Sequence, residues 1–274
     1  MSAPAVLGAT LALGLTTATG VWLLSLRLRD AAIVDVFWGF GFGAIALVAF
    51  TLAPGSLAPA GGRPELDLEG GVRPALVLSC VLLWSARLGV HMLARRRGRP
   101  EDFRYAAMRA HHGDAFGRVS LVTVFLFQAV IQWALSVPAQ LALVWPGPTA
   151  LGALDLLGAA LFLGGLTLET VADWQLERFR ADPRSHGQVM DRGLWRHSRH
   201  PNYLGEAVLW WGVGCLAVGS GVGWAALLSP AALTFLLLRV SGVPILEDGL
   251  RRRLPGYAAY AERTPAFLPF KLSG

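Results

Sequence analysis

The sequence contains few charged residues. Asp, Glu, Lys and Arg make up 15% of its 274 residues, whereas 54% are hydrophobic, and the mean hydropathy is +0.50. Soluble globular domains carry about 25% charged residues, so this composition excludes an ordinary water-soluble domain. An integral membrane protein is the class that fits.

Cysteine, internal repeats and polar linkers are also scarce. Cys80 and Cys215 each lie within an apolar stretch; their spacing is not that of a metal site, so we expect both to be packing residues. No repeat of fixed period occurs, and the polar insertions are too short for a separate soluble domain. We therefore predict one membrane domain over 1–274. The first apolar stretch lacks a basic segment before it and a cleavage site, so we expect a retained helix.

The apolar residues are gathered into long stretches. Most have close to the roughly 20 residues that a spanning helix needs. They cover 4–26, 31–53, 74–94, 119–145, 150–172, 204–220 and 222–240. The last two are short and share a glycine-rich turn, which leaves a re-entrant hairpin as an alternative. We predict an all-α integral membrane protein with seven transmembrane helices.

The basic residues alternate along the chain. They concentrate near Arg27, in 95–118, in 178–199 and in 251–271, whereas the loops between these segments hold only Arg63 and Arg73. Lys and Arg are retained on the cytoplasmic side of short loops, so we expect the N-terminus outside and the C-terminus in the cytoplasm. The same distribution explains the net charge of +6 without nucleic acid, and no protein partner is indicated. Membrane lipids are the expected surroundings.

The apolar stretch 150–172 ends in an acidic and basic pattern. Glu169, Asp173 and Arg180 share one face of a continued helix, because residues four apart are neighbours on a helix. Glu177 and Arg178 are expected to be solvent-exposed. A carboxylate deep in a membrane helix is costly and indicates function, so Glu169 and Asp173 are candidate binding residues.

A basic, aromatic and polar run, Gly193 to Glu206, leads into the sixth stretch. His197 and His200 have metal-ligand side chains, but zinc needs three or four ligands, so we favour anion binding. Guanidinium groups make paired hydrogen bonds to phosphate oxygens, and the amide of Asn202 suits a ribose or a carboxamide. The candidates from this run are Arg196, Arg199, His200, Asn202, Tyr203 and Glu206.

Further arginines lie at the predicted inner ends of the spans. Arg95 to Arg97 are expected to anchor the protein at lipid headgroups. Arg99, Arg104 and Arg109 are less easily explained in that way, and Arg239, at the inner end of the last span, is a further ligand candidate. We include Arg99, Arg109 and Arg239 in the predicted anion site.

Asp35 lies within the second stretch. If buried there, it can stay protonated and donate a proton to a substrate oxygen; the alternative is a structural ion pair with Arg87. Gln128 and Gln132 lie one turn apart in the fourth stretch and are either helix contacts or cavity lining.

These residues resemble the steroid 5α-reductase superfamily of membrane reductases, and within it an uncharacterised bacterial branch. The similarity is strongest from Glu169 to Glu206, in the acidic pair spaced by four, the Arg seven residues on, and the Pro-Asn-Tyr-Leu-Gly-Glu run. The resemblance implies hydride transfer from NADPH to an activated carbon–carbon double bond of a lipophilic substrate from the bilayer. It also implies a bacterial inner membrane location, with 1–118 on the substrate side and 119–274 as the cofactor-binding region.

By that resemblance Glu169, Asp173, Arg180, Asn202 and Glu206 line the cofactor, and Arg99, Arg109 and Arg239 reach its phosphates. The steroid enzymes polarise a ketone with a Glu and a Tyr, for which Asp35 and Trp84 stand at the nearest positions and are the catalytic candidates. An indole N–H only donates, so a steroid enone is in doubt.

Two other classes share features with this chain. The isoprenylcysteine carboxyl methyltransferases have the same architecture and an Arg-His-Pro-x-Tyr run, which makes a methyltransferase dependent on S-adenosylmethionine the second hypothesis. A non-catalytic membrane scaffold is the third. The pairing of Asn202 with Glu206 favours the reductases.

Overall fold

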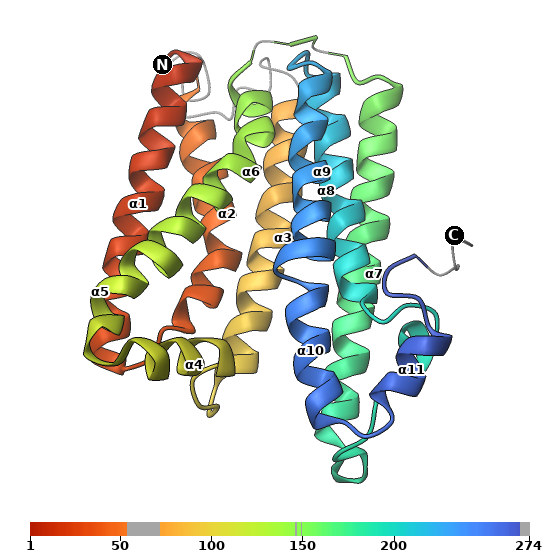
Figure 1. The fold of residues 1–274 in the computed structure, drawn as a ribbon. Helices are drawn as coiled ribbons and strands as arrows, with labels where there is room; N and C mark the ends of the chain where they lie inside the picture. The colour runs from red at the N-terminus through yellow and green to blue at the C-terminus, as the bar shows by residue number, and fades with distance from the viewer. Residues whose placement is uncertain (54–71, 146, 149, 269–274) are drawn as a thin grey trace. The chain divides into compact units, whose positions relative to one another are not determined.

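The computed structural model describes residues 1–53, 72–145, 147–148 and 150–268, and within these it contains helices and their connections but no β-strand (Figure 1). The predicted all-α fold class is confirmed. Six described helical segments are long and apolar enough to span a membrane. They are Ala3–Leu28, Ile33–Leu52, Val72–Arg96, Phe103–Val144, Ala153–Ala181 and Trp224–Arg253. The chain therefore has the make-up of a multi-pass membrane protein.

The remaining predicted span, 204–220, forms α8 (Pro201–Gly219). This helix is regular but is not one of the six segments. Residues 54–71, with Arg63, and the C-terminal 269–274 lie outside the described residues.

The described chain groups into two compact units. The first comprises 1–152 together with 216–229, and the second comprises 153–215 together with 230–274. The division that we expected at residue 118 falls inside the helical segment Phe103–Val144 of the first unit. Each unit is described below by itself.

Four helices of the first unit pack against one another. They are α1 (Ala3–Leu28), α2 (Ile33–Leu52), α3 (Val72–Arg96) and α6 (Phe127–Val144). The short α4 (Phe103–His112) lies across one end of them (Figure 1). It begins at Asp102, whose carboxylate accepts the Arg104 N–H at 3.0 Å as an N-cap. The chain then continues through α5 (Phe116–Ser120) and the π-helical turn Leu121–Leu126 into α6.

Small residues bring α2 and α3 together. A Cβ atom on Gly39 would lie 2.5 Å from the backbone nitrogen of Gly89, so the two backbones are in direct contact. Ser85, one turn before Gly89, donates to the Gly39 carbonyl at 2.6 Å and accepts the Gly43 N–H at 2.9 Å. Small residues four apart on both helices are the usual means of close packing where water supplies no hydrophobic driving force.

The second unit is built around α7 (Ala153–Ala181) and the part of α8 that belongs to it. The remaining elements follow the chain to its described end. They are α9 (Leu228–Phe235) from residue 230 on, the π-helical turn Leu236–Val240, α10 (Val243–Arg253) and α11 (Tyr257–Arg263). Gly256, at φ +87°, takes the left-handed conformation that the turn between α10 and α11 requires.

Candidate functional site

Asp35 lies at the start of α2 and is held by two side chains from α4. The Arg104 guanidinium lies 2.9 Å from one carboxylate oxygen of Asp35, and the Tyr105 hydroxyl donates to the other at 2.8 Å. Gln128 in turn donates to the Tyr105 hydroxyl oxygen at 3.2 Å. Asp35 is therefore an acceptor in an ion pair, and its observed partner is Arg104, which the sequence analysis had not paired with it.

Trp84, the second predicted catalytic residue, is buried in the first unit. It is 1% exposed, and its ring meets Phe42 edge to face with centroids 5.2 Å apart. The phenol that the sequence analysis missed is Tyr105, which lies next to Asp35 although 70 residues separate them. No periodicity links residues on α2 and α4, so only the fold reveals this pair.

Arg109 and Arg99 follow the third span, as predicted, but differ in their surroundings. Arg109 donates to both oxygens of Glu101, at 2.8 and 3.0 Å, and Glu101 also accepts the Ala31 N–H at 2.7 Å. Burial alone would raise the pKa of Glu101, but these hydrogen bonds outweigh it and the pKa lies below its ordinary value. Arg99 is exposed. In this structure Arg109 therefore fastens α4 to the turn between α1 and α2.

Glycines bring α7 and α8 of the second unit into backbone contact. A Cβ on Gly165 would lie 2.5 Å from the Leu209 nitrogen, and one on Gly205 would lie 2.5 Å from the Glu169 nitrogen. One on Gly212 would lie 2.6 Å from the Gly158 carbonyl oxygen. The close approach thus extends over about three turns of α7, from Gly158 to Glu169, and about two turns of α8, from Gly205 to Gly212.

This crossing gathers three of the predicted residues. Glu169 and Asp173 are 3% and 7% exposed, and Asn202, at the start of α8, donates its side-chain amide to Asp173 at 3.1 Å. Gly205 touches the backbone at Glu169, so Glu169 and Asn202 flank the same contact. Two buried carboxylates and an amide thus lie together where α7 and α8 are in contact. We call Glu169, Asp173 and Asn202 the acid–amide cluster.

The other predicted ligands of the second unit lie around this cluster in the sequence but have different environments. Arg180 is exposed and pairs with Glu177 at 3.2 Å. Arg196, in the 3-10 turn Gly193–Arg196, and Arg239, in the π-helical turn, are exposed. Glu206 follows Asn202 by one turn of α8 and is half-buried.

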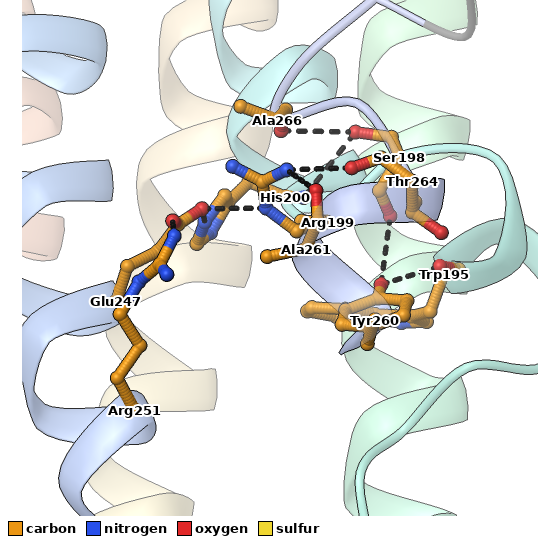
Figure 2. Close-up of polar contacts among 10 residues, drawn as sticks. All are labelled: Trp195, Ser198, Arg199, His200, Glu247, Arg251, Tyr260, Ala261, Thr264 and Ala266. Carbon is orange, nitrogen blue, oxygen red and sulfur yellow. Dashed lines mark hydrogen bonds and ion pairs between the residues drawn. The ribbon is translucent and has the colours of Figure 1, made fainter. Parts of the chain in front are cut away.

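Arg199 and His200 converge on a carboxylate that the sequence analysis did not single out. Figure 2 shows Glu247 of α10 accepting the Arg199 Nε–H at 2.7 Å and lying 3.1 Å from the His200 ring. Arg251, one turn along α10, lies 3.6 Å from the other oxygen. Tyr203 stacks on the His200 ring, with centroids 5.6 Å apart and planes 8° from parallel. The signal in the sequence was weak, because Glu247 looks like one more acid in a charged helix end.

Arg199 also binds the C-terminal segment. Its guanidinium donates to the carbonyls of Ala261 and Thr264, at 2.9 and 2.5 Å, and its backbone N–H donates to the Pro265 carbonyl at 2.9 Å. Ser198 adds a bond to Ala266 at 3.3 Å. We call these contacts the C-terminal clasp. In this structure Arg199, predicted as a phosphate ligand, serves to hold the chain end.

Buried tyrosines complete the clasp. Tyr260 donates to the Trp195 carbonyl at 2.5 Å, and the Trp195 indole donates to the Ala172 carbonyl at 3.1 Å, which connects the clasp to α7. Burial raises the pKa of Tyr257 to about 12 and raises that of Tyr260 as well. Both phenols therefore stay neutral at physiological pH. Among the described residues, no three His, Cys, Asp or Glu side chains are arranged to hold a metal ion.

Comparisons with known proteins give a family and a distant relative. The model of the family described as "Protein of unknown function (DUF1295)" matches residues 21–264. An uncharacterized protein of Schizosaccharomyces pombe is 26% identical over 212 residues, which cover 68% of this chain and 60% of the yeast protein. The match thus spans less than two thirds of that relative's length. No solved structure matches the chain.

Proposed function

This chain belongs to the family of unknown function DUF1295, and we propose that it is a membrane reductase that transfers a hydride from NADPH to an activated carbon–carbon double bond of a lipophilic substrate. The observation that carries the proposal is the acid–amide cluster. Its carboxylates are buried on α7, one of the apolar segments of spanning length, where charged groups are expensive and mark binding sites or proton pathways. A purely structural helix contact has no need of them.

The chemistry of the acid–amide cluster suits a nicotinamide. The carboxamide of a nicotinamide has two N–H donors and a carbonyl acceptor. The carboxylates of Glu169 and Asp173 can accept from those donors, and the Asn202 amide can donate to that carbonyl. Asn202 uses one amide donor on Asp173, which fixes the orientation of the side chain, and an asparagine amide carries a second donor and an acceptor besides. The phosphates of NADPH need cations, and the exposed Arg180, Arg196 and Arg239 of the same unit supply them.

The proposal includes a membrane topology. We add α8 to the six apolar segments as a seventh span, with the N-terminus outside and the C-terminus in the cytoplasm of a bacterial inner membrane. The support is the basic content of the segments 95–118, 178–199 and 251–271. A cysteine-accessibility map with a membrane-impermeant thiol reagent tests it: single cysteines at Arg97, Arg184 and the exposed Arg252 must all be labelled from the cytoplasmic side, and external labelling at 252 would mean that α8 does not cross.

The test of the cofactor is a titration of the detergent-purified protein with NADPH, NADH and S-adenosylmethionine, with thermal unfolding as readout. A ligand that binds the native state stabilises it by about 2.7 kcal/mol at a hundredfold excess over its Kd. We expect NADPH to stabilise the protein. Stabilisation by S-adenosylmethionine alone would instead identify a methyltransferase, and no effect of any of the three would favour a non-catalytic protein.

Two variants and one matched control locate the cofactor. Asn202→Ala and Arg180→Ala are each expected to abolish the NADPH-induced shift while the protein stays folded. Arg178→Ala removes the same charge from the same helix, where the guanidinium lies 5.4 Å from the ring centre of Trp174, and it should keep the shift. If both site variants respond to NADPH as the wild type does, the acid–amide cluster is not the cofactor site.

A further inference from the structure

The first unit contains a pocket that the cofactor proposal does not use. It lies among α1, α2, the π-helical turn Leu121–Leu126 and α6, with Gly14 and Thr17 on one side, Trp38 and Ala44 on another, and Gln128 on the third. Its volume is about 50 Å³. All the described residues that line it are uncharged, and most are apolar.

One end of the pocket is polar. Gln128 and Gln132 both line it. The Gln132 amide donates to the Trp38 carbonyl at 2.6 Å, and the Gln128 amide donates to the Tyr105 hydroxyl at 3.2 Å. The sequence favours either helix contact or cavity lining for these glutamines, and in the structure they do both. A glutamine amide has two donors and one acceptor, of which the bond to Tyr105 uses one donor.

Size and charge restrict what the pocket can hold. Pockets for compact ligands measure about 300–1,000 Å³, so a rigid fused-ring body needs far more room than is present. A hydrocarbon chain is slender and can lie partly in the pocket and partly in the surrounding lipid. Phe37, which is 37% exposed, also lines the pocket, so the pocket reaches the outer surface of an apolar segment. An ionised headgroup would be desolvated there without a counter-charge, at a cost of several kcal/mol.

We propose that this pocket binds the hydrocarbon chain of a neutral lipid that carries a hydroxyl or carbonyl group, with that group hydrogen-bonded to the amide of Gln128. This inference rests on the proposed function in making the lipid the substrate of the reductase, and it narrows the substrate class to chain lipids as opposed to steroids. As a binding site it has its own evidence and its own test.

The test is equilibrium binding of radiolabelled oleyl alcohol to the detergent-purified protein. Gly14→Leu fills the pocket from α1, since a Cβ there meets no atom within 4 Å, and Ala44→Leu fills it from α2. Gly20→Leu is the matched control, because Gly20 has the same open surroundings on α1 but does not line the pocket. Leucine favours the helix at both glycine positions, so these two variants should fold.

Saturable binding is expected for the wild type and Gly20→Leu. In both filling variants the Kd should be at least roughly tenfold higher, because about two buried methylene contacts are lost. Ionised oleic acid and a fused-ring steroid enone should compete at least about tenfold less well than oleyl alcohol. Gln128→Leu should weaken the binding of oleyl alcohol but not that of 1-octadecene, which has no hydroxyl group. Unaltered oleyl alcohol binding in both filling variants, or equal competition by the steroid, overturns the proposal.

The NADPH titration separates this proposal from the proposed function. Gly14→Leu leaves the second unit unchanged, so its NADPH-induced thermal shift should equal that of the wild type. If oleyl alcohol binds as described while NADPH stabilises nothing, the lipid site stands and the reductase proposal fails. If NADPH stabilises the protein but the filling variants bind oleyl alcohol as the wild type does, the reductase proposal stands and the lipid site fails.

Discussion

Replacing Glu247 by Gln tests whether the C-terminal clasp stabilises the fold. The carboxylate side chain is 10% exposed and lies 2.7 Å from Arg199 and 3.1 Å from His200. The Arg199 side chain is only 12% exposed, so neutralising Glu247 leaves a buried cation without its counter-charge. Breaking a buried pair by removing one partner costs about 3–5 kcal/mol. The glutamine oxygen still accepts one hydrogen bond, so we expect Glu247→Gln to lower the unfolding free energy by about 3 kcal/mol.

The adjacent residue provides the matched control. Asp248 pairs with Arg252 on the same helix at 2.7 Å, but the two side chains are 63% and 76% exposed. Exposed pairs contribute about 0–1 kcal/mol because water and salt screen them, so Asp248→Asn should cost at most about 0.5 kcal/mol. The two acids are neighbours on α10 and each lies 2.7 Å from an arginine, but only Glu247 and its partner Arg199 are buried, so the two substitutions should differ in cost.

The assay is a reversible denaturant titration in detergent micelles, combined with hydrogen exchange at the Arg199 amide, which donates to the Pro265 carbonyl at 2.9 Å. Glu247→Gln should lower the unfolding free energy and speed exchange at that amide, because the clasp opens more often. Equal unfolding free energies for Glu247→Gln and Asp248→Asn, with unchanged exchange, would refute the reasoning.

Three further predictions concern packing, pH and the buried phenol. Gly39→Ala places a Cβ atom 2.5 Å from the backbone nitrogen of Gly89 and should lower the unfolding free energy by about 1–3 kcal/mol. Gly8→Ala is the control, because open space surrounds Gly8, and it should not destabilise the protein. Thermal unfolding compares the two variants. Because the folded-state pKa of Glu101 is lowered, its stabilisation is complete above the ordinary carboxyl range and is lost as pH falls through the folded value. Stability measured between pH 7 and pH 3 should therefore fall less steeply for Glu101→Gln than for the wild type. Tyr260→Phe leaves the buried Trp195 carbonyl without its donor and should cost about 1–3 kcal/mol in the same denaturant titration.

The sequence predicts the helices of this protein well because apolar runs of spanning length have few alternatives. Six of the seven predicted stretches correspond to the apolar segments of the structure. The acid–amide cluster was also within reach, since Glu169 and Asp173 share a helix face and Asn202 begins the next long helix. Helical spacing links Glu169 to Asp173 within one helix, whereas residues 182–200 separate α7 from α8, so the contact of Asn202 with Asp173 comes from the fold.

Contacts between distant elements were beyond such reasoning. Tyr105 and Asp35 are 70 residues apart, and Glu247 is 48 residues from Arg199. No periodicity connects such pairs, and a basic residue near several acids does not reveal which one it will bind. For that reason the sequence indicates a phosphate ligand at Arg199, whereas its observed partners are Glu247 and the C-terminal carbonyls.

The glycine contacts between α7 and α8 also determine how the second unit can move. Gly158 and Gly165 on one helix, and Gly205 and Gly212 on the other, are both spaced by seven residues. Sliding one helix past the other by a single residue would push side chains into a backbone that has no room for them. We therefore expect α7 and the part of α8 that contacts it to move as one rigid body.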